Sequence, residues 1–234
     1  MKKSILLMAL FCMIIVLTAC STPGKVTVSK YCQAMKLNDK DTMAAMALEP
    51  KDLEFKSFEI VSVSEPVEKD LELSALTEQL NKLNQEKQDQ GDKAMDAQDT
   101  LDELKDELES SRRSKGELKK KIEEAEKAFE TEKQTYNDLV VKITALQKQM
   151  TREKDLIKMS TDRTEDLEMF KGKTFYQRVD VKMTLESGET NDYVFLLRRS
   201  DLTLENRTIN GRLVITKIAS AADFETEMQK EETK

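Results

Sequence analysis

Histidine is absent from this sequence, and only six of the 234 residues are glycine. The lack of histidine removes the most common general base and metal ligand of proteins. Carboxylates are plentiful, but no spacing sets any of them, or Tyr31, apart as an acid–base pair. We therefore predict that the protein is not an enzyme and that it uses no metal or cofactor.

An excess of basic residues is also missing. Lys and Arg number 38 against 45 Asp and Glu, which gives a formal charge of −7. Because binding to a phosphate backbone needs Lys and Arg in excess on one face, nucleic acid is not an expected partner. Aromatic residues make up only 5% of the chain and charged residues 35%. That balance is typical of a long, solvated helix.

Residues 1–19 are predicted to be a signal peptide. Two lysines precede the apolar run 5–16, which is too short to span a bilayer comfortably. The run ends in Leu17-Thr18-Ala19-Cys20, which resembles the lipobox of bacterial lipoproteins. The resemblance implies a diacylglyceryl thioether on Cys20, cleavage before this residue and acylation of the new N-terminus. An uncleaved anchor helix is the alternative interpretation.

Lipidation predicts where the protein resides. Each buried methylene contributes about 0.8 kcal/mol, so two or three acyl chains would hold the lipidated tether 20–24 at a membrane of the cell envelope. Ser21, rather than an aspartate, follows the cysteine. In a Gram-negative host this resemblance implies the outer membrane, with the protein facing the periplasm. Membrane contact is thus expected through the lipid on Cys20.

One cysteine is left in the mature chain. Cys12 would leave with the signal peptide and Cys20 would carry the lipid, so no disulfide framework is expected. We predict that Cys32 is a small buried hydrophobic residue on a helix. Pairing between molecules, or a reactive thiol, is the alternative.

Residues 71–168 carry the pattern of a coiled coil. Apolar residues recur at alternating spacings of three and four, with charged residues between them. This heptad indicates helix packed on helix and predicts no chemistry of its own. The predicted core residues are Leu76, Leu80, Leu83, Leu101, Leu104, Leu108, Leu118, Ile122, Phe129, Tyr136, Leu139, Ile143, Leu146 and Met150.

Two arrangements satisfy this heptad, an antiparallel hairpin within one chain and a parallel dimer of continuous helices. The heptad phase runs without a break through 110–116, which favours the continuous helix. The same segment, however, is the best turn candidate near the midpoint. Folding there sets Ala97 against Phe129 and Gln90 against Tyr136, so that bulky residues face smaller or more flexible ones. We favour a hairpin with its tip near 110–116; self-association stays open.

Two flanking segments, 25–70 and 169–222, are predicted to form one domain. The first offers two short helices, the second of them extending through Leu48 to Pro50, and then a strand. The second offers three strands, with Asn210-Gly211 as a hairpin signal before the last of them. The C-terminal tail, 223–234, is predicted to be a short helix that frays.

Neither flank is convincing alone, but together they supply a sheet with one apolar face and a helical layer to cover it. The predicted fold class is therefore α+β. We expect a small cone-like domain of helices and antiparallel sheet, split by a long antiparallel coiled-coil α-hairpin.

The flanks also resemble a known superfamily. Four stretches are similar to the nuclear-transport-factor-2-like (cystatin-like) superfamily: Ser29-Lys30-Tyr31-Cys32-Gln33-Ala34-Met35, Asn38-Asp39, Asp41-Thr42-Met43 and Asn210-Gly211-Arg212-Leu213-Val214-Ile215. The resemblance implies a cone-shaped domain that often holds a ligand pocket. The candidate pocket residues are Met35, Met46, Phe58, Phe175 and Phe195, although a set of this kind is more often plain core.

These features favour a membrane-anchored structural or interaction protein, a scaffold or adaptor that contacts an unknown envelope protein through its coiled coil. The alternative function is a ligand-binding cone-shaped domain presented on a lipid anchor. A lipobox with an α-hairpin is also similar to the periplasmic adaptors of efflux pumps. Those adaptors need Gly-rich lipoyl half-motifs, which six glycines do not supply.

Overall fold

The computed structural model of the chain describes residues 22–110, 115–164, 166–204 and 207–232. The predicted signal peptide, Cys20 and most of the predicted hairpin tip lie outside these residues. Within the described part of the chain, no helix combines the length and the apolar character needed to cross a membrane.

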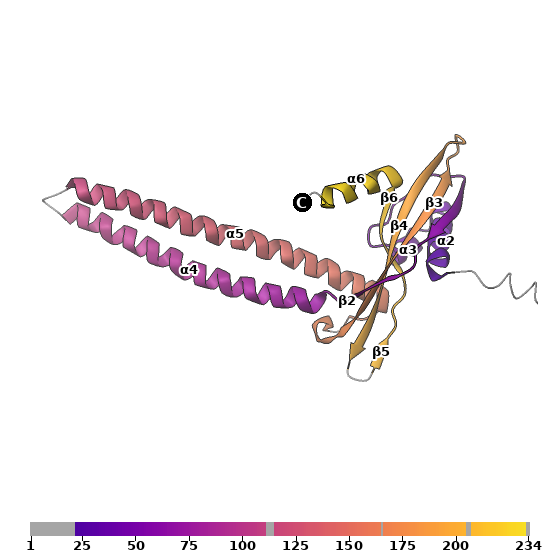
Figure 1. Cartoon of the computed structure of the whole chain (residues 1–234), viewed down its shortest axis with the longest axis horizontal. Helices are drawn as coiled ribbons and strands as arrows, with labels where there is room; N and C mark the ends of the chain where they lie inside the picture. The colour runs from indigo at the N-terminus through magenta and orange to yellow at the C-terminus, as the bar shows by residue number, and fades with distance from the viewer. Residues whose placement is uncertain (1–21, 111–114, 165, 205–206, 233–234) are drawn as a thin grey trace, which may run out of the picture. The chain divides into compact units, whose positions relative to one another are not determined.

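The chain divides into two compact units. One unit combines the chain up to Leu71 with Asp155–Lys234, and the other is Glu72–Lys154. The second unit consists of two long helices that run antiparallel side by side, α4 (Leu73–Ser110) and most of α5 (Lys115–Thr161) (Figure 1). The predicted fold class is confirmed: the protein is α+β, and a long antiparallel hairpin interrupts the α+β unit in the sequence.

The helical layer of the α+β unit comes from the N-terminal flank. Helix α2 (Pro23–Lys36) begins with proline in its first turn, and Asn38 then adopts a positive φ of 53° that ends the helical path. Asp39 caps α3 (Lys40–Met46), because its carboxylate accepts hydrogen bonds from the backbone and the hydroxyl of Thr42.

Helix α3 is shorter than predicted. It ends at Met46 instead of continuing through Leu48 towards Pro50. The reason is tertiary: Ala47 is extended and bridges Ile215, and the Leu48 backbone N–H donates to the Ile215 carbonyl at 2.9 Å. A hydrogen bond to the sheet thus replaces the last helical turn.

The sheet has more strands than the sequence predicts. The first flank contributes two strands instead of one, and the second contributes four instead of three. Strands β1 and β2 both pair with β3, β3 pairs with β4, and β4 pairs with both β5 and β6, all antiparallel. The strands are β1 (Ser57–Val63), β2 (Val67–Asp70), β3 (Lys171–Thr184), β4 (Thr190–Leu204), β5 (Arg207–Ile209) and β6 (Val214–Ser220).

Two short helical segments complete the unit. The 3-10 helix η1 (Leu167–Met169) precedes β3, and α6 (Ala221–Glu232) follows β6. Helix α6 covers most of the segment predicted to be a fraying tail. Its first turn is capped by Ser220, whose hydroxyl accepts from the Asp223 backbone N–H at 3.2 Å and donates to the Asp223 carboxylate.

The core of the α+β unit lies between α2 and one face of the sheet. The predicted alternation places Val179, Val181 and Met183 on this face, where all three are buried. Tyr31 of α2 meets Phe195 of β4 edge-on, with ring centres 6.2 Å apart. Its hydroxyl accepts from the backbone N–H of Lys51 and donates to the carbonyl of the same residue, which fixes the loop before β1.

The last turn of α5 is joined to the sheet through Ser160. The Ser160 hydroxyl accepts from the Ser200 backbone N–H at 2.9 Å and donates to the Arg212 carbonyl at 2.8 Å. The Arg212 backbone N–H in turn donates to the Ser160 carbonyl at 2.7 Å. The side chain of one serine therefore satisfies a donor of β4 and an acceptor of the segment between β5 and β6.

This junction explains why Asn210-Gly211 is not the predicted hairpin turn. Leu204 of β4 already pairs with Arg207 of β5, so the chain has reversed before Asn210. Residues 210–213 instead separate β5 from β6, which pair with β4 on either side of residues 199–201. A Cβ at Gly211 would overlap the Ser160 hydroxyl and the Ser200 carbonyl, so this position requires glycine for close approach.

Candidate functional site

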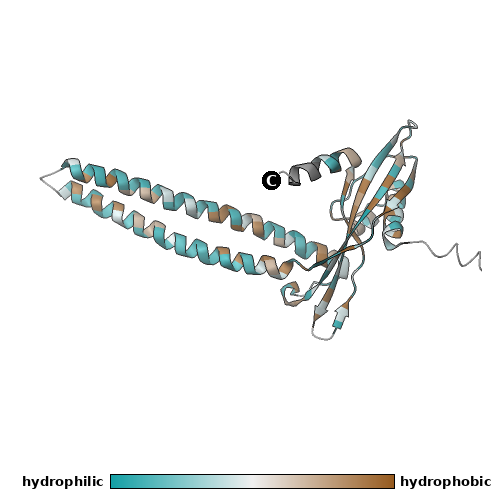
Figure 2. Ribbon diagram, viewed as in Figure 1, coloured by the Kyte–Doolittle hydropathy of each residue, from teal (hydrophilic) through white to brown (hydrophobic). Residues whose placement is uncertain are grey.

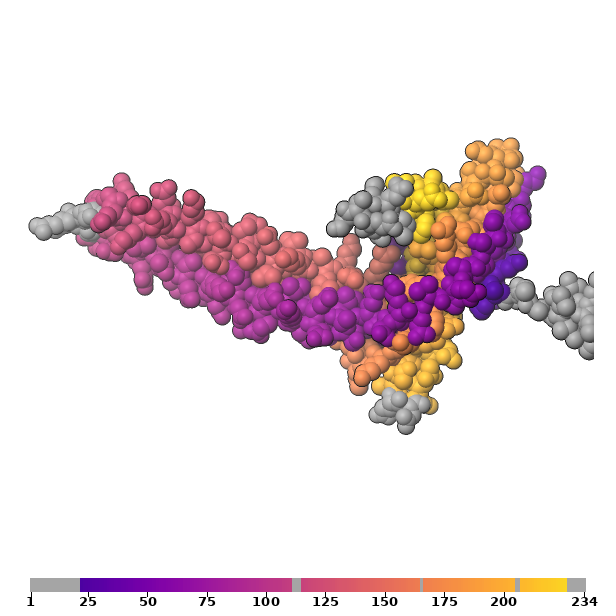
Figure 3. All heavy atoms as spheres, in the orientation of Figure 1, coloured from indigo at the N-terminus to yellow at the C-terminus, as the bar shows by residue number. Residues whose placement is uncertain are grey.

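The hairpin core follows the predicted heptad. Each predicted core residue is buried or half-buried, while most positions between them are exposed. Figure 2 shows hydrophobic residues recurring along two otherwise hydrophilic arms, and Figure 3 shows the arms in contact along their length. The most deeply buried of the predicted set are Leu76, Leu101, Leu118, Leu139, Ile143, Leu146 and Met150.

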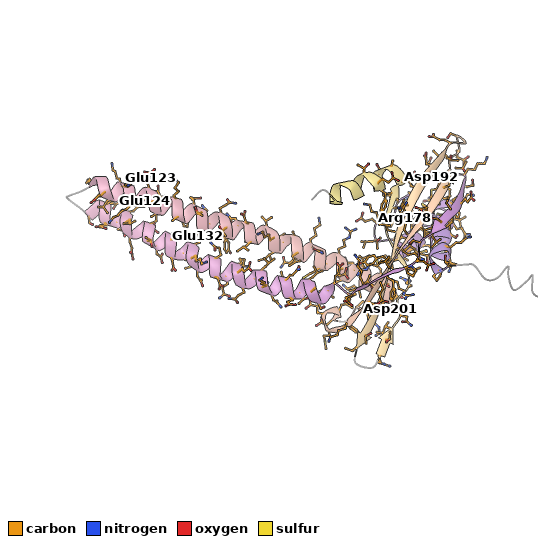
Figure 4. The ribbon with its side chains drawn as sticks, in the orientation of Figure 1. Glu123, Glu124, Glu132, Arg178, Asp192 and Asp201 are labelled. Atoms are coloured by element: carbon orange, nitrogen blue, oxygen red, sulfur yellow. The ribbon has the colours of Figure 1, made fainter. Side chains whose placement is uncertain are left out.

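One polar layer interrupts the apolar core. Gln90 is only 7% exposed, and its amide donates to the Glu132 carbonyl at 3.1 Å and also to the Glu132 carboxylate. Figure 4 shows Glu132 on α5. The sequence predicts Gln90 opposite Tyr136, and in the structure Glu132 supplies the hydrogen-bond partner that this buried amide needs. A buried polar pair satisfied in one alignment fixes the register of a coiled coil.

The outer flank of the hairpin beside this layer is hollowed. A groove of about 640 Å³ opens along α4, with the ring of Tyr136 contributing from α5. Met95 at this groove is 64% exposed although it is a large apolar side chain. The groove is lined by Asn84, Lys87, Gln88, Gly91, Asp92, Ala94, Met95 and Tyr136.

Small residues at the interface create this groove. Ala94 occupies a core position, and Gly91 lies next to the core, so the layer between the helices is thin here. Helix α5 contributes the large residue Tyr136 at this level, and a Cβ at Gly91 would lie 3.5 Å from its ring. The heptad assigns Tyr136 to the core and does not predict the groove. The available signal in the sequence is Met95, an apolar residue one position outside the core seam among small and amide-bearing residues.

Charged side chains dominate elsewhere on the hairpin. Lys105 of α4 and Glu126 of α5 form an ion pair of 3.3 Å across the two helices, with both side chains about half exposed. Such a pair contributes roughly 0–1 kcal/mol and serves register more than stability. Figure 4 shows Glu123 and Glu124 near the N-terminal end of α5. Charged and polar side chains therefore make up most of the outer surface away from the groove.

The α+β unit has a hollow of its own, of about 340 Å³. Phe175 lines it, and the guanidinium carbon of Arg199 lies 4.4 Å from the centre of the Phe175 ring. Arg199 also pairs with Asp201 at 3.0 Å.

The other four candidate pocket residues take different places. Phe195 and Met35 belong to the buried core, and Met46 and Phe58 pack against it. The structure therefore does not gather the predicted set around this hollow. Plain core, the alternative given for this set, describes Phe195, Met46 and Phe58, while Met35 also lines a second hollow of about 470 Å³.

Cys32 lies in the same core and is free. Burial raises the pKa of its thiol to about 12, so almost no thiolate is present at neutral pH. This geometry fits the predicted small buried hydrophobic residue and disfavours a reactive thiol. Among the described residues, no group of three or more acidic or cysteine side chains is arranged to hold a metal ion.

No protein-family model, curated protein or solved structure matches this chain. The resemblances to bacterial lipoproteins and to the nuclear-transport-factor-2-like superfamily therefore stay predictions from the sequence.

Proposed function

We propose that the protein is a membrane-anchored lipoprotein of the cell envelope that acts as a scaffold or adaptor through its coiled-coil hairpin. The observation that carries this proposal is the hairpin itself. Helix α4 has 38 residues, which corresponds to an arm of about 57 Å at 1.5 Å per residue. A hairpin of this length presents a long surface for contact.

The hairpin satisfies its own core, which leaves its outer faces available. Leu101, Leu118, Leu139 and Ile143 are buried where the helices face each other. The Gln90–Glu132 layer fixes the register of the two helices, although it replaces apolar packing at this level. Coiled coils use such buried polar pairs where a single defined structure is needed. A surface with one alignment can present a reproducible binding face to an envelope protein.

The anchor in this proposal is the lipid on Cys20. The lipobox motif supports it, and Ser21 supports the outer membrane in a Gram-negative host. The partner is an envelope protein of unknown identity, and no nucleic acid, cofactor or catalytic step is part of the proposal. Two or three acyl chains suffice for stable attachment.

The test of this proposal is a chain in which residues 76–150 are replaced by a short Gly/Ser bridge. Ser160 and the last turn of α5 stay in place, so we expect the α+β unit to keep its fold. Affinity capture from detergent-solubilised envelopes should lose its specific partner bands down to background. Protection of Cys32 from a thiol reagent checks that the remaining unit is folded, since this residue is fully buried there.

A shortened chain that is folded and retains every partner would contradict this proposal. That outcome would instead favour the second candidate function, a ligand-binding α+β unit on a lipid anchor. The specific observation in its favour is the hollow beside Phe175 and Arg199, which combines apolar walls with one guanidinium.

A further inference from the structure

One stripe of helix α4 is free of charge although charged residues surround it. Its positions are spaced alternately three and four apart, so they form a second seam outside the core seam of the hairpin. Four of its six residues line the groove, and one of these four is the exposed Met95. The uncharged stripe consists of Asn81, Asn84, Gln88, Gly91, Met95 and Gln98.

Gly91 at the middle of this stripe is not explained by the hairpin alone. A Cβ there would contact only the Tyr136 ring, at 3.5 and 3.8 Å, which is ordinary van der Waals contact. Alanine would therefore fit, and glycine inside a helix costs about 1 kcal/mol relative to alanine. A glycine in such a place allows the backbone of another helix to approach closely.

The stripe is complementary to itself. Asparagine and glutamine amides both donate and accept hydrogen bonds, so an amide that faces its own copy finds a partner. Met95 facing its own copy would cover an apolar side chain that is 64% exposed in one hairpin. A second copy of the chain therefore satisfies both kinds of residue in the stripe.

The flanking charges select the orientation. Lys87 precedes Gln88 on one side of the stripe, and Asp92 follows Gly91 on the other side. In a parallel pair of helices these two flanking positions face each other across the seam, so Lys87 of each copy meets Asp92 of the second copy. An antiparallel pair would join like flanks and leave Lys87 and Asp92 apart.

We propose that two copies of the protein associate through the uncharged stripe of α4, with the two stripes parallel and in register. The inference rests on the geometry of the hairpin alone and does not depend on the lipid anchor or on any other partner. It predicts that each stripe residue faces its own counterpart in the second copy.

Single cysteines test this geometry in the full mature chain with Cys20→Ser and Cys32→Ala. Asn81→Cys, Gln88→Cys and Met95→Cys should each form disulfide-linked dimers under mild oxidation, because each faces its own copy. Asp89→Cys, an exposed position on another face of α4, is the matched control and should stay monomeric. Equal cross-linking at all four positions, or at none, would overturn the proposal, and cross-linking at only one stripe position would overturn the parallel register.

Sedimentation equilibrium gives an independent measurement on chains without added cysteines. Gln88→Glu places two carboxylates opposite each other and should raise the dimer dissociation constant at least about tenfold. Gln79→Glu makes the same chemical change at an exposed position outside the stripe and should leave the constant unchanged. Helical content by circular dichroism checks that both variants fold. A wild-type chain that stays monomeric into the millimolar range would refute the second copy as occupant, even if the hairpin still captures other envelope proteins.

Discussion

Replacing Gly211 with alanine is expected to lower the free energy of unfolding of the α+β unit by about 3–5 kcal/mol. The added methyl group would overlap the Ser160 hydroxyl and the Ser200 carbonyl. Relief of that overlap must move Ser160 away from the Ser200 N–H and the Arg212 carbonyl, both of which would lose their hydrogen bonds. The cost therefore combines overpacking with two unsatisfied backbone groups.

The measurement is urea-dependent exposure of Cys32 in the mature Cys20→Ser chain, where it is the single thiol. Because Cys32 is buried in the α+β unit, its reaction with a thiol reagent reports this unit and not the hairpin. Gly116→Ala is the control, since nothing lies within 4 Å of a Cβ there and the residue belongs to helix α5. Because Gly116 lies in the hairpin, this variant should leave the urea midpoint of Cys32 exposure unchanged. Equal stability of the two variants would contradict the structural role given to Gly211.

The Cys20→Ser substitution is expected to abolish lipidation. Without the thiol no thioether forms, and the precursor should stay uncleaved or fail to reach its membrane. Metabolic labelling with a palmitate analogue, followed by fractionation of the envelope, measures both effects. Cys12→Ser is the matched control, because this cysteine lies in the same segment but would be removed with the signal peptide. Undiminished label on the Cys20→Ser chain would rule out the lipoprotein interpretation.

The two long helices and the buried face of β3 could be predicted from the sequence because each follows a repeating pattern of neighbouring residues. Heptad spacing between Leu76 and Met150 identifies both helices, and each predicted core residue is buried or half-buried in the structure. Alternation along β3 likewise identifies Val179, Val181 and Met183 as one buried face. In each case a repeating contact with one neighbouring element determines the pattern.

The errors occur where a distant residue determines the local structure. Asn210-Gly211 has the composition of a tight turn, but Ser160, some fifty positions earlier, occupies the space beside it and makes it an interruption of a strand path. Leu48 likewise hydrogen-bonds to Ile215 instead of extending α3. No window of sequence around either position contains these partners.

The candidate site was predicted in part. The heptad identifies two packed helices, the turn segment 110–116 favours the hairpin, and Gln90 and Tyr136 at core positions indicate a disturbed layer. Which of the two receives a polar partner depends on the relative rotation of the helices, which places Glu132 beside Gln90. The uncharged stripe is a sequence pattern in itself, but its significance comes from the exposure of Met95.

Photo-cross-linking in intact cells tests whether the hairpin is the contact surface of the protein. A photoreactive amino acid is placed at Val141, an exposed aliphatic residue of the hairpin, or at Leu37, an exposed aliphatic residue of the α+β unit. The two positions are matched in chemistry and differ only in the unit that carries them. We expect the probe at 141 to form specific adducts with an envelope protein and the probe at 37 to form none. Specific adducts from position 37 alone would contradict the account and move the contact surface to the α+β unit.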